Sequence, residues 1–352
     1  MLTLINVGHI LESMTTPIKR IGFACKWAEI NKKGEIASAE GLNTGGTTMA
    51  WAKRNNRETV EHKILEVARQ NIVNTSSLIR KIATLPEPLR MLRITSDMLS
   101  FYTHPDYIDF WQSTEIQNQL ERWMAPLGKY AREHNIRLSF HPDQFVVLAS
   151  ENENIVNNSI REFEYHTDMA RWMGYGKTFQ DMKINVHISG RQGPEGIRKA
   201  YQRLSPEARN CITIENEENA WGLDDCLTLS DLLPIVLDIH HHWVREGEYL
   251  EIADQRVQRV IDSWRGVRPT LHYSVSREDC LVGHCPDTLP DREALIASGK
   301  NKQKLRAHSD YYWNNAVNNW AMTFHDKFDI MCESKAKNLA SHKLYEKYYG
   351  TI

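Results

Sequence analysis

Short apolar segments rich in β-branched residues alternate along the chain with longer segments whose apolar residues recur every three or four positions. The short segments have the length and composition of buried strands, and they lie at residues 20–25, 91–95, 137–141, 183–187, 211–215, 234–238, 270–274 and 328–333. The longer segments, such as 58–85 and 116–135, have the period of amphipathic helices. This alternation predicts a parallel sheet of eight strands connected by helices.

The turn after the first predicted strand distinguishes the two common parallel architectures. Open doubly wound sheets usually carry a glycine-rich phosphate-binding turn there, and this sequence has no such turn. We therefore predict an α/β fold made of a single (β/α)8 TIM barrel over residues 20–340. An N-terminal extension is expected over residues 1–19 and a C-terminal tail over 341–352. The longest irregular segments are expected after the first and seventh strands.

Composition indicates the class of protein and the cellular compartment. Of the 352 residues, 41% are hydrophobic and 25% are charged, as in globular proteins with a substantial core. No apolar run approaches the roughly 20 residues that span a bilayer, and the polar N-terminus lacks the features of a secretory signal. The six cysteines show no disulfide framework. We expect a cytoplasmic monomer with no membrane contact and no obligate protein partner.

Side chains that bind metals stand at the ends of most predicted strands. These residues are His141, His187, Glu215, Asp238, His272 and Glu333. Three more histidines, His104, His241 and His308, follow in the adjacent loops. A single histidine at a strand end is usually structural, but the carboxyl ends of barrel strands converge at one mouth, where repeated placement predicts a cluster.

The mixture of imidazole and carboxylate groups favours zinc, manganese or iron over a purely magnesium site. The ligands outnumber the roughly four to six positions around one ion, so two or three divalent ions are predicted. Paired metals suit phosphodiester hydrolysis, although sugar isomerisation on a barrel also uses them. The net charge of −2 neither supports nor excludes a DNA substrate, because bound metals can make an acidic site positive.

Nine short motifs then appear in a fixed order, which is GFAC, SFYTHP, LSFHPDQF, VHISG, TIENE, LDIHHH, LHYS, AHSDY and MCESKAK. This series, over about residues 20–337, resembles the UV damage endonuclease family, which is related to endonuclease IV. The resemblance implies excision repair of damaged double-stranded DNA. The expected reaction is a single-strand nick immediately 5′ to cyclobutane dimers, 6-4 photoproducts or abasic sites. Manganese is the expected metal, with zinc and magnesium as alternatives, and a bacterial protein would be associated with the nucleoid.

The resemblance also assigns roles to residues of this chain. The implied metal ligands are His104, His141, His187, Glu215, Asp238, His241, His272, His308 and Glu333. The implied catalytic residues are Glu215, His272, Glu333 and Lys335. Glu215 would bridge two metals, and Lys335 would contact phosphate, with a solvated lysine at a strand end as the alternative interpretation. Gln144, Phe145 and Phe23 would probe the duplex, because a flat apolar side chain replaces the stacking lost when a nucleotide leaves the helix.

This chain departs from the family in its aromatic probes and in one strand residue. Relatives commonly carry tyrosine at the positions of Phe145 and Phe23, and the stacking surface survives that change. Many relatives also carry a lysine, which carboxylation would turn into a ligand, where this chain has Thr270. The number of metals bound therefore stays open.

Basic residues near the predicted mouth are candidates for contacts with the DNA backbone. They are Lys53, Arg54, Arg57, Lys300, Lys302, Lys304 and Arg306. Such contacts give affinity without sequence preference, whereas a solvated charge run is the alternative interpretation. Two other functions are carried forward: a sugar isomerase-like metal enzyme, and a family member that binds lesions without cutting.

Overall fold

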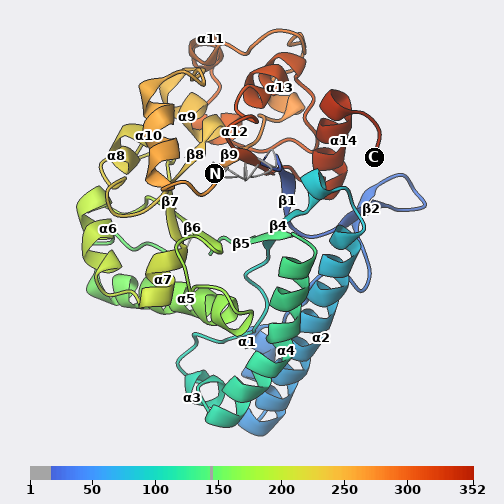
Figure 1. The fold of residues 1–352 in the computed structure, drawn as a ribbon, viewed down its shortest axis with the longest axis vertical. Helices are drawn as coiled ribbons and strands as arrows, with labels where there is room; N and C mark the ends of the chain where they lie inside the picture. Colours follow the sequence, from blue (N-terminus) through green and yellow to red (C-terminus); the bar gives the residue numbers. More distant parts are fainter. Residues whose placement is uncertain (1–16, 143–145) are drawn as a thin grey trace, which may run out of the picture.

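The computed structural model describes residues 17–142 and 146–352, and it confirms the predicted TIM barrel (Figure 1). Parallel strands close in the order β1-β10-β9-β8-β7-β6-β5-β4. Their bounds are Ile21–Cys25 (β1), Met91–Ile94 (β4), Arg137–Phe140 (β5), Lys183–His187 (β6), Ile212–Glu215 (β7), Ile235–Asp238 (β8), Thr270–Tyr273 (β9) and Asp329–Cys332 (β10). Each coincides with one of the predicted strands.

The barrel closes where β1 pairs with both β10 and β4. Phe23 is in register with Cys332 on one side and with Leu92 on the other. At Gly22 a Cβ atom would lie 2.6 Å from Cγ of Met91. The first strand therefore needs a residue without a side chain at this position, so that Met91 can pack against its backbone.

Amphipathic helices surround the barrel, as the apolar spacing predicts. Helix α2 (Arg57–Ala83) begins at Asn56, whose side chain accepts a hydrogen bond from the Thr59 amide, and α4 (Thr114–Glu133) packs beside it (Figure 1). The other barrel helices are α5 (Glu153–Trp172), α6 (Gly193–Tyr201), α7 (Pro206–Cys211), α8 (Leu223–Leu227), α9 (Ile239–Glu246), α10 (Gln255–Ser263), α13 (Asn315–Met322) and α14 (Asn338–Tyr349).

The loops contain more regular structure than their sequences indicate. The loop after β1 forms an antiparallel pair, β2 (Ala28–Ile30) and β3 (Ile36–Ser38), and then α1 (Met49–Ala52). The other short elements are the 3-10 helices η1 (Glu87–Leu89) and η2 (Glu278–Cys280) and the helices α3 (Ile108–Trp111), α11 (Arg292–Ala297) and α12 (Lys302–Leu305). Short helices in the loop after β9 begin at Asp291 and Asn301, whose side chains accept backbone hydrogen bonds.

The C-terminal segment expected as a tail is part of the barrel domain. Residues 341–349 continue α14, and this helix packs against β1. The ring of His342 lies 5.7 Å from that of Trp27, centroid to centroid, and Leu344 is buried. Of the expected N-terminal extension, only residues 17–19 are described. Within the described residues, no helix has the length and apolar character needed to cross a membrane.

Candidate metal centre

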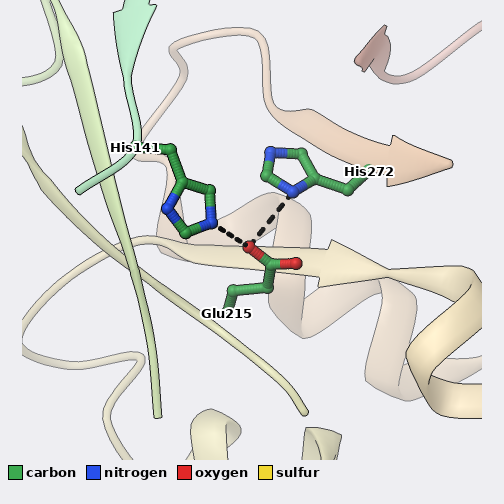
Figure 2. A group of neighbouring side chains, drawn as sticks. All are labelled: His141, Glu215 and His272. Atoms are coloured by element: carbon green, nitrogen blue, oxygen red, sulfur yellow. Dashed lines mark ion pairs between the residues drawn. The ribbon is translucent and has the colours of Figure 1, made fainter. Parts of the chain in front are cut away.

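Glu215, the last residue of β7, lies at the centre of the predicted ligand cluster. Its side chain is fully buried, and its Oε2 atom lies 3.3 Å from Nε2 of His141 and 3.1 Å from Nδ1 of His272 (Figure 2). These three residues come from β7, the end of β5 and β9. Closure of the barrel therefore brings together side chains from strands that are not neighbours, as predicted for the mouth.

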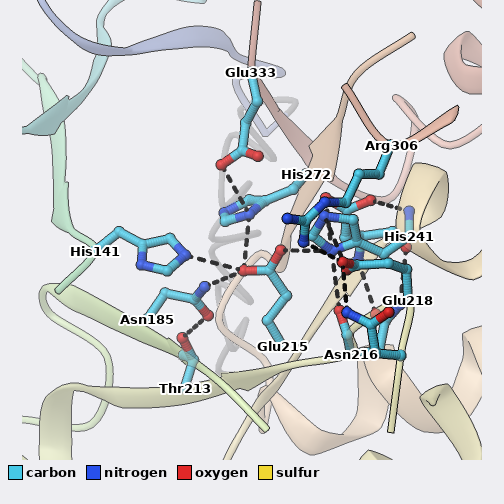
Figure 3. A network of polar contacts seen from close by, with 12 residues as sticks. His141, Asn185, Thr213, Glu215, Asn216, Glu218, His241, His272, Arg306 and Glu333 are labelled. Atoms are coloured by element: carbon cyan, nitrogen blue, oxygen red, sulfur yellow. Dashed lines mark hydrogen bonds and ion pairs between the residues drawn. The ribbon is translucent and has the colours of Figure 1, made fainter. Parts of the chain in front are cut away.

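Two further groups of ligand atoms overlap the first. In one, His241 on α9 places Nδ1 3.6 Å from Oε1 of Glu215, and His187 completes the group. In the other, Nδ1 of His272 lies 3.4 Å from Oε1 of Glu333 (Figure 3), and Asp238 completes the group. Glu215 and His272 each belong to two of the three groups. An arrangement with shared ligands suits neighbouring ions bridged by a carboxylate.

Several buried ligand atoms have no hydrogen-bond partner, which fits a metal site. Oε1 of Glu215, Oδ2 of Asp238 and Nδ1 of His272 are all in this state. Buried polar atoms are almost always satisfied by hydrogen bonds. Divalent cations would satisfy these three atoms at once, because carboxylate oxygen and imidazole nitrogen are their ordinary ligands in proteins.

The protonation behaviour of the histidines agrees with this interpretation. Burial lowers the pKa of His187 and that of His272 to about 4, which keeps both rings neutral and able to bind a metal. Burial alone would lower the pKa of His241 as well, but Asp238 and Glu215 raise it to about 9. The carboxylates that stabilise a proton on His241 would stabilise a metal ion at the same place.

Buried amides hold the carboxylate ligands in place. Nδ2 of Asn185 donates to Oε2 of Glu215, and Oδ1 of Asn185 accepts from Thr213 at 2.7 Å (Figure 3). Oδ1 of Asn216 accepts from the backbone N of Asp238 at 2.9 Å, and the Asp238 carboxylate accepts from the backbone N of His241 at 2.6 Å. Such supporting contacts orient ligands before a metal binds.

Known proteins with a similar sequence and fold identify the family. The model of the UV-endonuclease UvdE family matches residues 19–351. The chain belongs to this family. Two UvdE relatives are the UV DNA damage endonucleases of Bacillus cereus, 25% identical over 80% of this chain and 81% of the relative, and of Bacillus mycoides, 26% identical over 85% and 86%. The crystal structure of SacUVDE shares the fold, with a TM-score of 0.70, 22% identity, and coverage of 95% of this chain and 99% of that one.

The UvdE barrel of this chain contains two ion pairs at the site that the sequence analysis missed. Arg93 of β4 pairs with Glu333. Arg306 pairs with Glu218, whose side chain is only 4% exposed (Figure 3). Arg93 could have been found from the sequence. A charged residue inside a predicted buried strand needs a partner, and the mouth is where carboxylates gather.

A buried lysine was missed in the same way. Lys183 begins β6, is 3% exposed, and lies with Nζ 2.8 Å from Nε2 of His272. Burial lowers the pKa of Lys183 to about 7. Its position inside a predicted strand was again the available signal.

The remaining predicted ligands lie around the three groups. His308 lines a cavity of about 650 Å³ together with His187, His241 and Glu333. His104 lies in the loop after β4 and lines a neighbouring cavity of about 970 Å³. Its Nδ1 accepts a hydrogen bond of 3.2 Å from the backbone N of Asp106. The structure thus brings seven of the nine predicted ligands into the three groups, with His308 and His104 outside them.

One predicted probe residue is wrong, and two cannot be placed. Phe23 is only 1% exposed and packs edge-on against Trp27 and His342, on the helix side of β1. A side chain in the core between strand and helix has no access to DNA. The resemblance assigned Phe23 by its place in the GFAC motif, which does not show which face of the strand a residue occupies. Gln144 and Phe145 lie outside the described residues.

The predicted basic residues differ in their exposure and in their position relative to the metal centre. Arg306 lines the cavity of the metal centre, beside Gln303. Lys53, Arg54 and Lys304 are exposed, Lys300 and Lys302 are partly exposed, and Lys335 is exposed beyond Glu333. Arg57 is engaged elsewhere, in ion pairs of 2.6 Å with Glu61 and with Asp109.

Proposed function

We propose that this protein is a DNA repair endonuclease that nicks double-stranded DNA immediately 5′ to UV photoproducts, and that also incises at abasic sites. The observation that carries the proposal is the set of three overlapping ligand groups sharing Glu215 and His272, in a member of the UV-endonuclease UvdE family. The named activity of the relatives supports the same reaction. Two or three divalent ions, with manganese expected, serve as cofactors.

Divalent ions bound by these ligands would supply activation of a water molecule and neutralisation of charge on the phosphate. The protein contributes position and charge. Glu215 and His272 would hold neighbouring ions, and Arg93 keeps the Glu333 carboxylate at the same site. Arg306, held by Glu218 at the edge of the cavity, binds a phosphate of the DNA backbone. Lys335 contacts phosphate beside the last ligand, and Gln144 with Phe145 probes the duplex.

The shape of the mouth favours DNA over a sugar substrate. Val146 lines both the cavity of about 650 Å³ and that of about 970 Å³, and their linings include His308 in the first and the loop of Gly45 and Gly46 in the second. A polymer uses a long, polar surface of this kind, whereas an isomerase encloses one small molecule. The sugar isomerase-like alternative is therefore less well supported than the endonuclease.

The test is a nicking assay on supercoiled plasmid, irradiated or not, with metal-free protein and added manganese. The proposal expects nicks only with irradiated DNA and metal. Duplexes with one defined dimer, 6-4 photoproduct or abasic site then give the cleavage position. Binding of the lesion duplex without any nick would instead support the non-cleaving alternative. Absence of both binding and nicking would contradict the proposed function.

A further inference from the structure

Lys183 crosses the barrel interior beneath the metal centre. It belongs to β6, and its amine reaches His272 on β9, although β7 and β8 separate these two strands in the barrel. Nζ lies 2.8 Å from Nε2 of His272. Among the described residues, no carboxylate oxygen lies within 4.0 Å of Nζ of Lys183. The hydrogen-bond partner of Nζ is therefore His272. A lysine is rarely buried without such a carboxylate.

The ring of His272 is held between two different environments. Its Nδ1 atom faces Oε2 of Glu215 at 3.1 Å and Oε1 of Glu333 at 3.4 Å, whereas Nε2 faces Lys183. Nδ1 is the nitrogen available to a metal when Nε2 carries the ring hydrogen and donates it to the unprotonated amine of Lys183. A metal-binding imidazole is normally fixed by a hydrogen bond on its other nitrogen, which sets both the ring orientation and the nitrogen that binds.

Strand β6 supports both of the shared ligands from one face. Lys183, Asn185 and His187 alternate along the strand and point into the barrel, since every second residue of a strand shares a face. Asn185 donates to Glu215, while Lys183 contacts His272. Glu215 and His272 are the residues that belong to two ligand groups each. Lys183 and Asn185 of β6 thus contact the two side chains that neighbouring ions would share.

We propose that Lys183 is a positioning residue of the metal centre, which accepts a hydrogen bond from Nε2–H and so holds the His272 ring with Nδ1 toward Glu215 and Glu333. Thr270 cannot take this role. It lies two residues before His272 on the same face of β9, is fully buried, and its Oγ1 atom has no hydrogen-bond partner. The inference rests on the proposed metal-dependent function, but its principal test is metal binding by the free protein.

The test compares Mn²⁺ binding to metal-free wild type and Lys183→Met by calorimetry and by metal counting after equilibrium dialysis. Methionine keeps an unbranched side chain of similar length and removes the hydrogen bond. Affinity for the ions that share His272 should fall about 10- to 100-fold, the usual effect of losing such a contact. Lys183→Gln, which retains a polar group able to bond to the ring, should recover part of this loss. Lys327→Met, at an exposed lysine just before β10, should bind like wild type.

Wild-type affinity and stoichiometry in both Lys183 variants would overturn the proposal, because a lysine that merely fills space leaves metal binding unchanged when replaced by methionine. If Lys183→Met does not fold, Lys183→Gln alone tests the proposal. Weaker manganese binding by this variant is then expected, and unchanged manganese binding would contradict the proposal. Failure of the proposed function gives a different result, in which wild type binds manganese but does not nick damaged DNA.

Discussion

Nδ1 of His272 lies 3.1 Å from Oε2 of Glu215, although β8 separates their two strands in the barrel. Curvature of the closed sheet makes this contact possible, because inward side chains from strands that do not pair meet across the interior. Glu215 is thereby surrounded by imidazole from β9, from α9 and from the end of β5. Its negative charge therefore lies where cations held by these ligands would meet.

Replacing Glu215 with glutamine should abolish incision and leave the fold intact. An amide has nearly the shape of the carboxylate, but it cannot supply the negative charge that two neighbouring cations need. Bound manganese, counted after dialysis, should fall along with the nicking of irradiated plasmid. Circular dichroism of the purified variant checks the fold. Wild-type nicking by Glu215→Gln at saturating manganese would contradict the assignment of Glu215 as a bridging ligand.

Arg93→Met should destabilise the metal-free protein by about 3–5 kcal/mol, because it leaves the buried Glu333 carboxylate without its partner. Bound metal should recover part of the loss, since a cation then replaces the guanidinium as the counter-charge of Glu333. The free energy of unfolding, measured by denaturant titration with and without manganese, tests both statements. Equal losses in the two conditions would show that Arg93 stabilises the protein independently of the metal centre.

The sequence specified the barrel well because each strand is a separate apolar segment with its own helix. It also located the ligands, because a residue at the carboxyl end of a barrel strand lies at the mouth whatever its neighbours are. It missed Lys183 and Arg93 because a charged residue inside a strand has two explanations, and only three-dimensional contacts with His272 and Glu333 distinguish them. Phe23 was misassigned because the resemblance carried over a motif position, and neither the motif nor alternation along β1 shows which face meets the helices.

At the opposite end of the barrel, Asp329→Asn should lower stability by about 3–5 kcal/mol at neutral pH. Asp329 accepts from Arg137 Nη1 at 2.6 Å and from Arg268 Nε at 2.7 Å, with Arg20 close by. Burial alone would raise the pKa of Asp329, but Arg137 and Arg268 outweigh burial and lower it.

The sign of the pH dependence follows from that lowered pKa. An aspartate whose pKa is lower in the folded state contributes stability above its unfolded pKa of about 3.9. This contribution is lost as the pH falls through the folded value. The difference in unfolding free energy between wild type and Asp329→Asn should therefore be largest at neutral pH and narrow below about pH 4. A difference that stays constant across this range would exclude the charge as the cause.

Thr270→Lys should destabilise the protein by about 1–3 kcal/mol and weaken its metal binding. Thr270 is fully buried, and a longer side chain there overfills a packed interior. The added amine would also compete with Lys183 for the space beside Nε2 of His272. Thermal unfolding and a manganese titration measure the two effects.

Adding Lys183→Thr to this variant should restore part of the lost stability and part of the lost metal binding, since one amine again occupies the barrel interior. Tighter binding in the single variant would show that Thr270 faces free space.

Arg306→Gln should weaken binding to DNA without reducing metal content. Its guanidinium is 45% exposed, is oriented by Glu218, and lines the cavity shared with His187 and Glu333. If it contacts one phosphate, the log–log dependence of affinity on salt should become shallower by about 0.9, because one fewer counterion is released. Fluorescence anisotropy with a lesion duplex at several salt concentrations measures this slope.

Arg265→Gln, at an exposed arginine before β9 and thus at the opposite end of the barrel, removes the same charge and should leave the slope unchanged. Equal slopes for wild type and Arg306→Gln would place Arg306 outside the DNA interface and limit its role to its ion pair with Glu218.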